Sequence, residues 1–142
     1  MTLRILMTGA SGFLGRVIQS RKLELLLTVG RSEPNSIKCD LSRDIPALPD
    51  GLKHVIHCAG KAHSTPKSIE EEDEFFRVNL DGTKNLVEGI ERSASAVKSF
   101  TFISTVAVYG RQEGCNLNES TPLNGSSPYA KSKIKAERFL RD

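Results

Sequence analysis

The stretch Thr8-Gly9-Ala10-Ser11-Gly12-Phe13-Leu14-Gly15 decides the fold that this sequence predicts. It follows Leu3–Met7, an apolar run with the length and composition of a buried parallel strand. It opens Phe13–Ser20, which has the pattern of a short helix. In this context the first glycine allows a tight turn, the second lets backbone amides approach a pyrophosphate, and the third lets the helix pack closely on the strand. The stretch therefore predicts a dinucleotide-binding turn, with the positive end of the helix facing the phosphates.

Beyond this turn, apolar segments of strand length alternate with segments of helical pattern. Further strands are expected at Leu23–Val29, Ile37–Cys39, Val55–Cys58 and Phe100–Ser104. Such an alternation predicts an α/β fold with a doubly wound, Rossmann-like parallel sheet that helices cover on both faces.

The later helices are separated from the strands by polar loops, over residues 61–68 and Gly110–Pro128. One long helix or two abutting ones are expected over residues 70–92, and a last helix over Tyr129–Leu140. The acidic run Glu70–Glu74 is expected in the first turn of its helix, where carboxylates face the positive end of the helix dipole.

The composition is that of a globular domain that binds neither nucleic acid nor membrane. The 142 residues are 38% hydrophobic and 26% charged, and the net charge of +3 is dispersed along the chain rather than gathered in a basic stripe. No apolar stretch approaches the ~20 residues that span a bilayer, and no signal peptide precedes the first strand. We therefore expect a cytoplasmic protein.

The cysteines and histidines do not predict a metal site. Cys39, Cys58 and Cys115 are odd in number and widely spaced, which indicates a reducing compartment. His57 and His63 have no carboxylate or thiol at a ligand-like spacing, so we expect both to be structural.

The end of the second strand bears on the choice of cofactor. An acidic residue there normally accepts the ribose 2′-hydroxyl of NAD. Here Arg31 follows the strand and could pair with a 2′-phosphate; the alternative is a solvated loop residue that at most stacks on adenine. Asp40, followed by Leu41, fits a carboxylate that binds the adenine amino group, or else caps the following turn. NADP(H) is therefore favoured over NAD(H).

Tyr129 and Lys133 are four residues apart, so they share one face of the last expected helix. Thr105 lies at the end of the fifth strand, and the carboxyl ends of strands are where such sheets bind ligands. A phenol titrates near ~10 and needs nearby positive charge to act as a base at neutral pH, which a lysine and a cationic nicotinamide could supply. The alternative is a solvated pair on a surface helix.

Five blocks of the sequence, in order along the chain, resemble the NAD-dependent epimerase/dehydratase family of extended short-chain dehydrogenases/reductases. They are Thr8–Gly15, His57–Gly60, Val78–Thr83, Ser104–Gly110 and Pro128–Lys133. The resemblance implies that Tyr129 is the general acid/base on the substrate oxygen and that Lys133 also holds the nicotinamide ribose. It implies that Thr105 bonds the same oxygen, with Ser104 a second candidate, and that Asn79 braces the backbone of the fourth strand.

The resemblance and the glycine turn together imply a set of cofactor-binding residues. They are Gly9, Ser11, Gly12, Phe13, Leu14, Gly15, Arg31, Asp40, Leu41, Cys58, Ala59, Gly60, Tyr129 and Lys133. A full sheet of this kind needs at least one more strand after Asp142. We therefore expect residues 1–142 to form an NAD(P)-binding Rossmann domain that is incomplete at its C-terminus and lacks the substrate-binding part.

The resemblance also restricts the types of reaction that this chain is expected to catalyse. Family dehydratases carry an Asp-Glu pair directly after the catalytic threonine, whereas this chain has Val106-Ala107, which disfavours a sugar 4,6-dehydratase. A C4 epimerase or 4-keto reductase of a nucleotide-diphosphate sugar is left as the leading hypothesis. The alternatives are a non-catalytic NADP(H)-binding module and a dehydrogenase or reductase of a steroid-like or other small ketone. Family members often dimerise through the long helices, here near 70–92 and 129–140, so a homodimer is expected.

Overall fold

The computed structural model describes residues 4–21, 23, 25–62 and 64–142. Within these ranges five strands form one sheet in the order β3-β2-β1-β4-β5, and all neighbouring strands are parallel. The strands are β1 (Arg4–Thr8), β2 (Leu26–Gly30), β3 (Ile37–Lys38), β4 (Leu52–His57) and β5 (Ser99–Phe102). The chain therefore runs outward from β1 to β3, returns to place β4 beside β1, and runs outward again to β5. The predicted doubly wound sheet is confirmed.

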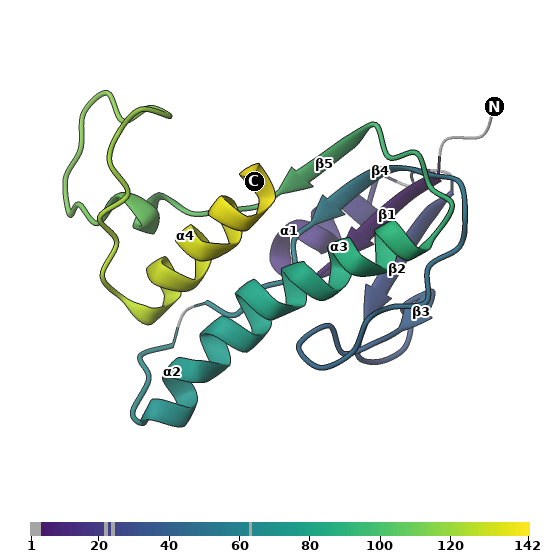
Figure 1. Ribbon diagram of the computed structural model, residues 1–142, viewed down its shortest axis with the longest axis horizontal. Coiled ribbons are helices and arrows are strands. Elements are labelled where there is room, and N and C mark those ends of the chain that lie inside the picture. The colour runs from purple at the N-terminus through teal and green to yellow at the C-terminus, as the bar shows by residue number, and fades with distance from the viewer. Residues whose placement is uncertain (1–3, 22, 24, 63) are drawn as a thin grey trace.

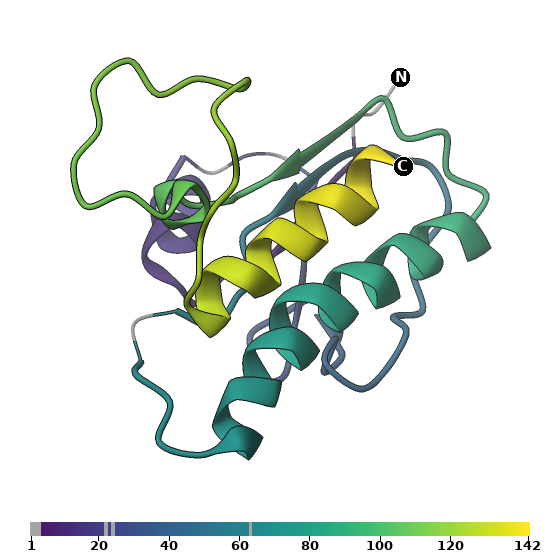
Figure 2. The same ribbon diagram turned by 60° about the vertical axis from the view of Figure 1, so that its left-hand side comes forward.

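The described residues contain four α-helices, and helices lie on both faces of the sheet. They are α1 (Phe13–Gln19), α2 (Ile69–Phe76), α3 (Gly82–Arg92) and α4 (Pro128–Arg141). Figures 1 and 2 show α1 on one face, and α3 and α4 side by side on the other. A π-helical turn, Arg77–Asp81, joins α2 to α3 without a break, so the predicted long helix is continuous. None of the helices in the described ranges is both long and apolar enough to cross a bilayer.

Local sequence explains where α2 and α4 begin. The Ser68 side chain accepts a hydrogen bond from the Glu71 amide (3.3 Å), and the first turn of α2 holds three of the predicted acidic residues. Ser127 accepts from the Ala130 amide in the same way (3.1 Å), and Pro128 occupies the first turn of α4, where its missing N–H has no cost. Both helices therefore start at a side-chain cap that satisfies a free amide.

Several strand boundaries differ from the sequence expectations. The second strand begins at Leu26 rather than Leu23, because Leu25 has a φ of 61°, a left-handed conformation that a strand cannot contain. The fourth begins at Leu52 rather than Val55, since it continues its pairing with β1 down to Arg4. Leu3 and Glu24, which fall within predicted strands, lie outside the described residues.

The core lies between the centre of the sheet and the helices on one face. Its buried side chains come from β1, β2, β4, α3 and the loop after β3: Leu6, Val29, Leu41, Leu52, Val55 and Leu86. Full burial of each such aliphatic side chain stabilises the fold by roughly 1.5–3 kcal/mol. This packing fixes the central strands relative to one another, so their carboxyl ends form one rigid edge.

Candidate functional site

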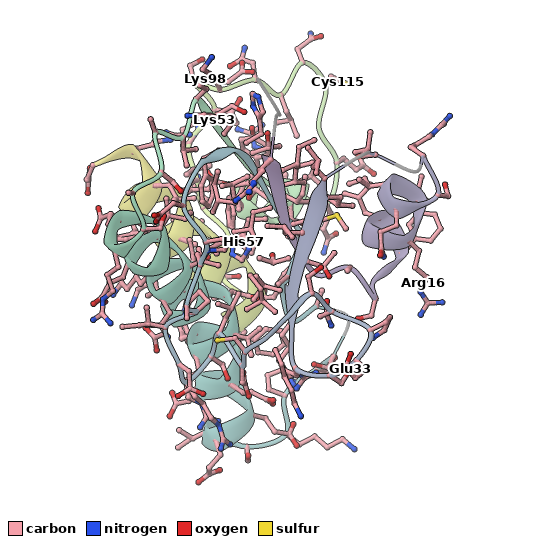
Figure 3. The ribbon with its side chains drawn as sticks, turned by 90° about the vertical axis from the view of Figure 1, so that its right-hand side faces the viewer. Arg16, Glu33, Lys53, His57, Lys98 and Cys115 are labelled. Atoms are coloured by element: carbon pink, nitrogen blue, oxygen red, sulfur yellow. The ribbon has the colours of Figure 1, made fainter. Side chains whose placement is uncertain are left out.

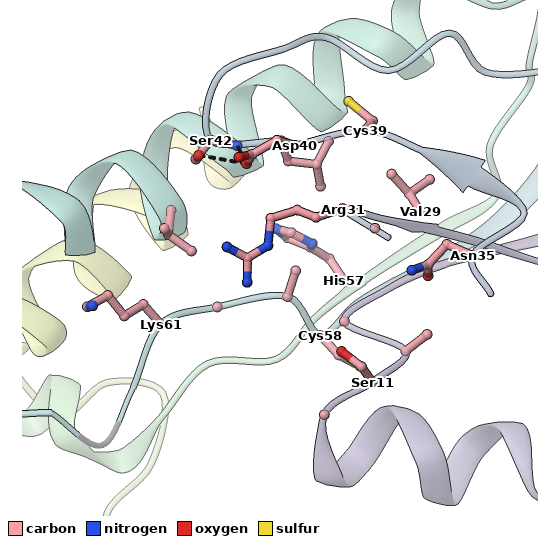
Figure 4. A pocket seen from close by; sticks show the side chains of 18 of the residues that line it. Ser11, Val29, Arg31, Asn35, Cys39, Asp40, Ser42, His57, Cys58 and Lys61 are labelled. Carbon is pink, nitrogen blue, oxygen red and sulfur yellow. Dashed lines mark hydrogen bonds between the residues drawn. The ribbon is translucent and has the colours of Figure 1, made fainter. Parts of the chain in front are cut away.

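A cavity of about 520 Å³ lies at the carboxyl ends of the strands (Figure 4). Ligands bind at this edge in open parallel sheets. Nine of the predicted cofactor residues line it: Gly9, Ser11, Gly12, Arg31, Asp40, Leu41, Cys58, Ala59 and Gly60. The remaining five lie outside this lining: Phe13, Leu14, Gly15, Tyr129 and Lys133.

The glycine turn between β1 and α1 has the geometry that its three glycines require. Gly9 has a φ of 73°, and a Cβ there would lie 2.6 Å from the Ala59 amide nitrogen. A Cβ on Gly15 would lie 2.8 Å from the Ala10 Cα, so α1 packs directly on the turn. A Cβ on Gly12 would approach only the Gly9 carbonyl oxygen, at 3.3 Å. Gly12 therefore leaves a surface where a ligand can come close to the backbone.

Arg31 extends from the end of β2 into the cavity, between Asp40 and the segment that carries Lys61 (Figure 4). Its charge contributes to the lowered pKa values of two carboxyl groups in the lining. The pKa of Asp40 is lowered chiefly by its hydrogen bond from Ser42, and that of Glu74 chiefly by its hydrogen bond from Lys61, with Arg31 adding to both. Arg31 is therefore a cation facing the cavity.

Asp40 caps the turn that follows β3. Its Oδ1 accepts hydrogen bonds from the Ser42 amide (3.1 Å) and from the Ser42 hydroxyl (2.7 Å), and its Oδ2 lies 4.0 Å from the Arg43 Nε. Asp40 thus has the capping role that the sequence indicates as one of its two possible roles. The contact with adenine stays a prediction.

Four charged residues of the site were not singled out from the sequence: Arg43, Lys61, Glu74 and Arg77. Lys61 donates to Glu74 Oε2 at 2.6 Å, with its ammonium 5.4 Å from the centre of the Phe75 ring. Lys61 directly follows Gly60, and this adjacency was the signal that could have found it. Arg77 lies in the π-helical turn and had no such signal.

The cavity lining has two more basic than acidic side chains. In the part of the chain that the structure describes, Arg43 and Lys61 pair with carboxylates of the lining, whereas Arg31 and Arg77 form no ion pair. Two cations are therefore available to an anionic ligand, in addition to the amides of the glycine turn.

Lys133 is buried at the edge of this cavity. Its Nζ donates to the Ile103 carbonyl (2.6 Å), lies 3.9 Å from the centre of the Phe102 ring, and would be 4.0 Å from a Cβ on Gly60. Burial lowers the pKa of Lys133 to about 8, while the charges of Glu137 and Cys58 act in the opposite direction. A buried lysine that titrates near neutral pH is typical of functional sites.

Thr105 directly precedes a 3-10 turn, Val106–Tyr109, which packs against α4, the helix that carries Tyr129 and Lys133. Thr105 caps this turn, and its Oγ1 accepts a hydrogen bond from the Ala107 amide (3.2 Å). The half-buried Tyr129 ring packs on the Phe75 ring, with 6.2 Å between their centres. The structure therefore joins the segment after β5 to α4, and a shared site of Thr105, Tyr129 and Lys133 stays a prediction.

His57 lies at the centre of the molecule, between sheet and helices (Figure 3). Its Nδ1 is 2.6 Å from Thr8 Oγ1, and its Nε2 is 2.9 Å from Thr83 Oγ1. Because Thr83 donates its hydrogen to the Asn79 carbonyl, Nε2 must donate to Thr83, and Nδ1 accepts from Thr8. Burial lowers the pKa of His57 to about 3, so the ring is neutral and structural, as expected.

The sequence predicted no metal site at His57 and His63. His63 lies outside the described residues. Among the residues that the structure does describe, no group of three or more potential ligands could hold a metal ion.

Asn79 lies in the π-helical turn and is fully buried. Its Oδ1 accepts from the Lys61 amide (2.7 Å), and its Nδ2 donates to the Lys61 carbonyl (3.0 Å) and to Ser132 Oγ (2.9 Å). Every polar atom of this side chain is thus used, and the segment after β4 is fixed to α4. This is the bracing role that the resemblance implied.

Residues 5–142 of the chain match the NAD dependent epimerase/dehydratase family. The chain belongs to this family. A UDP-glucose 4-epimerase from Mus musculus is 38% identical over 92 residues, which are 64% of this chain and 26% of that relative. A GDP-6-deoxy-D-mannose reductase from Pseudomonas aeruginosa is 32% identical over 148 residues, covering 96% of this chain and 46% of that relative.

Solved structures show the same architecture. The protein RMD from Pseudomonas aeruginosa, solved in complex with NADPH, matches 97% of this chain and 48% of its own chain, with a TM-score of 0.71 and 26% identity. This chain thus spans about a quarter to a half of the length of these members of the epimerase/dehydratase family.

The two residues directly after Thr105 are both apolar. The resemblance places an Asp-Glu pair there in dehydratases. Here Val106 and Ala107 begin the 3-10 turn, and Val106 is 77% exposed. Neither side chain can transfer a proton.

Proposed function

We propose that this chain carries the cofactor-binding and acid–base residues of an NAD(P)-dependent enzyme that acts on a nucleotide-diphosphate sugar, as a C4 epimerase or 4-keto reductase. The observation that carries the proposal is the position of Lys133. It is buried with a pKa of about 8, on the same helix as Tyr129, and lies beside Gly60 of a cavity lined by more cations than anions. Membership of the epimerase/dehydratase family, with an epimerase and a reductase among the relatives, supports the substrate class.

The residues present fit a dinucleotide. The lack of a side chain on Gly12 leaves space at the start of α1, where no side chain caps the helix, and Arg31 and Arg77 add positive charge along the cavity. The family is described as NAD dependent, and one neighbour was solved with NADPH. We propose NADP(H) as the preferred form, because Arg31 stands where a carboxylate would select NAD. Bound there, the dinucleotide would supply the hydride chemistry.

The acid–base steps belong to side chains at the start of the 3-10 turn and on α4. Tyr129 Oη exchanges a proton with the substrate oxygen, and the Lys133 ammonium one helical turn away stabilises the negative charge that forms on Tyr129. Because Thr105 Oγ1 accepts from Ala107, its own hydrogen is free to donate to the same substrate oxygen.

We further propose that residues 1–142 are an NAD(P)-binding domain that acts together with a substrate-binding part. Two copies would associate through residues 70–92 and 129–140, where α3 and α4 lie side by side on one face of the sheet (Figure 2). A cytoplasmic location belongs to the same proposal.

Tyr129→Phe tests the proposed function, because it removes only the proton that Tyr129 transfers. We expect turnover to fall roughly 10²–10⁴-fold, as for the loss of a general acid/base, with NADPH affinity retained. Turnover is measured in the protein that includes the substrate-binding part, as interconversion of UDP-glucose and UDP-galactose and as NADPH oxidation with a 4-keto nucleotide sugar.

The control is Tyr109→Phe, which alters the other tyrosine of the chain. Equal losses in the two variants would contradict the role of Tyr129. Turnover of small ketones but of no nucleotide sugar would favour the alternative substrate class. Tight NADPH binding without any turnover would favour a binding module.

A further inference from the structure

Two consecutive residues just after β5, Ile103 and Ser104, are bonded to two successive turns of α4. The Ile103 carbonyl accepts from Lys133 Nζ at 2.6 Å, and the Ser104 hydroxyl donates to Glu137 Oε1. Lys133 and Glu137 are four residues apart, so they lie on the same face of the helix. Glu137 thus holds the strand end that leads directly into Thr105.

The carboxylate of Glu137 is well shielded from solvent. Its side chain is 15% exposed, and its second oxygen is 3.7 Å from Arg141, whose own side chain is 65% exposed. An exposed arginine at this distance is screened by water and neutralises the carboxylate only weakly. The negative charge of Glu137 therefore acts mainly toward the interior.

Lys133 is the buried cation nearest to this charge along the helix, and it is 4% exposed. From the end of β4 it faces His57, which is neutral, and Cys58, whose thiol pKa is raised by burial. The π-helical turn contributes the uncharged amide of Asn79, beside Gly60. Of the described groups whose charge acts on Lys133, Glu137 is the one that is negative at neutral pH.

We propose that Glu137 is a positioning residue of the acid–base site. It holds Ser104, and with it the approach to Thr105, against α4, and it supplies the counter-charge for the buried Lys133 ammonium. This role rests on the proposed function, in which a protonated Lys133 stabilises negative charge on Tyr129.

Substitution of Glu137 by glutamine separates the charge from the hydrogen bond. The amide oxygen of glutamine still accepts from Ser104, so Glu137→Gln keeps the link to β5 and removes only the charge. The pKa of Lys133 should then fall by about one pH unit, because an opposite charge no longer favours the ammonium form. Glu137→Ala removes both the charge and the hydrogen bond from Ser104, so it should in addition destabilise the segment at the end of β5.

The test is a pH titration of this chain by NMR that follows the chemical shifts of Lys133 Nζ and Cε. These signals are assigned by their loss from the spectrum of the variant Lys133→Arg. The control Glu88→Gln removes the same charge from an ion pair on α3, between Glu88 and Arg92. A lower Lys133 pKa in Glu137→Gln alone supports the proposal. An unchanged Lys133 pKa, or an equal fall in Glu88→Gln, overturns it.

Turnover separates this inference from the proposed function. If the enzyme converts nucleotide sugars, the alkaline limb of its pH–rate profile should move to lower pH in Glu137→Gln, together with the Lys133 titration. If no nucleotide sugar is converted, the proposed function fails. The NMR titration still decides whether the charge of Glu137 raises the pKa of Lys133.

Discussion

The protonation state of His57 makes the stability of this fold depend on pH. The ring has a pKa of about 3 when folded, against an ordinary value of 6.5. Between these values the unfolded chain binds a proton at this residue and the folded chain does not, so acid favours unfolding. The contribution of His57 to stability is complete above pH 6.5 and is lost as the pH falls towards 3.

We predict that His57→Gln weakens this pH dependence. A glutamine can still accept from Thr8 and donate to Thr83, but it takes up no proton, whereas His57 costs about 1.4 kcal/mol of folding free energy for each unit of pH below its ordinary pKa. Urea unfolding at pH 7.5 and pH 5.0 measures the difference.

The matched control is His54→Gln, on the same strand as His57 but facing Ser99 at the surface. The change in the pH dependence of unfolding should be larger in His57→Gln than in this control. A His57→Gln variant with the same slope as the wild-type chain would show that the buried ring is not the group responsible.

The residues of the candidate site differ in how well their part in it can be predicted from the sequence. The glycine turn and the pair of Tyr129 and Lys133 could be singled out because, in each case, the residue types and their spacing lie within one segment; the catalytic roles of Thr105, Tyr129 and Lys133 stay predictions. Glu74 and Arg77 could not, because each becomes part of the site only when α2 and the π-helical turn pack beside the strand ends.

Among the elements, the π-helical turn does most to connect the cavity with α4. Through Asn79 it binds both backbone polar groups of Lys61 and the hydroxyl of Ser132, which in turn donates to the Tyr129 carbonyl. Turns of this kind are frequent at functional sites. Its extra residue gives Asn79 the direction needed to meet two other segments at once.

We expect Asn79→Ala to destabilise the fold by about 1–3 kcal/mol, because the amide and carbonyl of Lys61 lose their partners. Hydrogen exchange at the Lys61 amide should also become faster. The control Asn85→Ala removes one side-chain bond from α3 to the Leu41 carbonyl and should leave Lys61 exchange unchanged. Slow exchange at Lys61 in Asn79→Ala would contradict the bracing role.

Helices and strands could be predicted from the sequence where the apolar residues recur at the spacing of only one of these two structures. Each of the five strands and both later helices lie close to their predicted positions. The 3-10 turn Val106–Tyr109 was missed because its apolar residues read equally well as a continuing strand. The π-helical turn was missed because the apolar pattern passes through it without interruption.

For the whole molecule, the alternation of strands and helices was enough to predict the sheet and the edge at which a ligand binds. The excess of basic side chains in the cavity was not predictable, because these side chains come from four separate segments: those after β2, β3 and β4, and the π-helical turn. This charge is the basis for expecting a phosphorylated dinucleotide there.

Titration of this chain with NADPH and with NADH, followed by nicotinamide fluorescence, tests the account most directly. NADPH should bind about tenfold more tightly or better, since a charge-assisted hydrogen bond from Arg31 is worth roughly 1.5–3 kcal/mol. Arg31→Asp should weaken NADPH more than NADH, and Arg111→Asp, in the exposed loop before α4, should alter neither. Binding of neither dinucleotide, or equal losses for both in Arg31→Asp, would contradict the account.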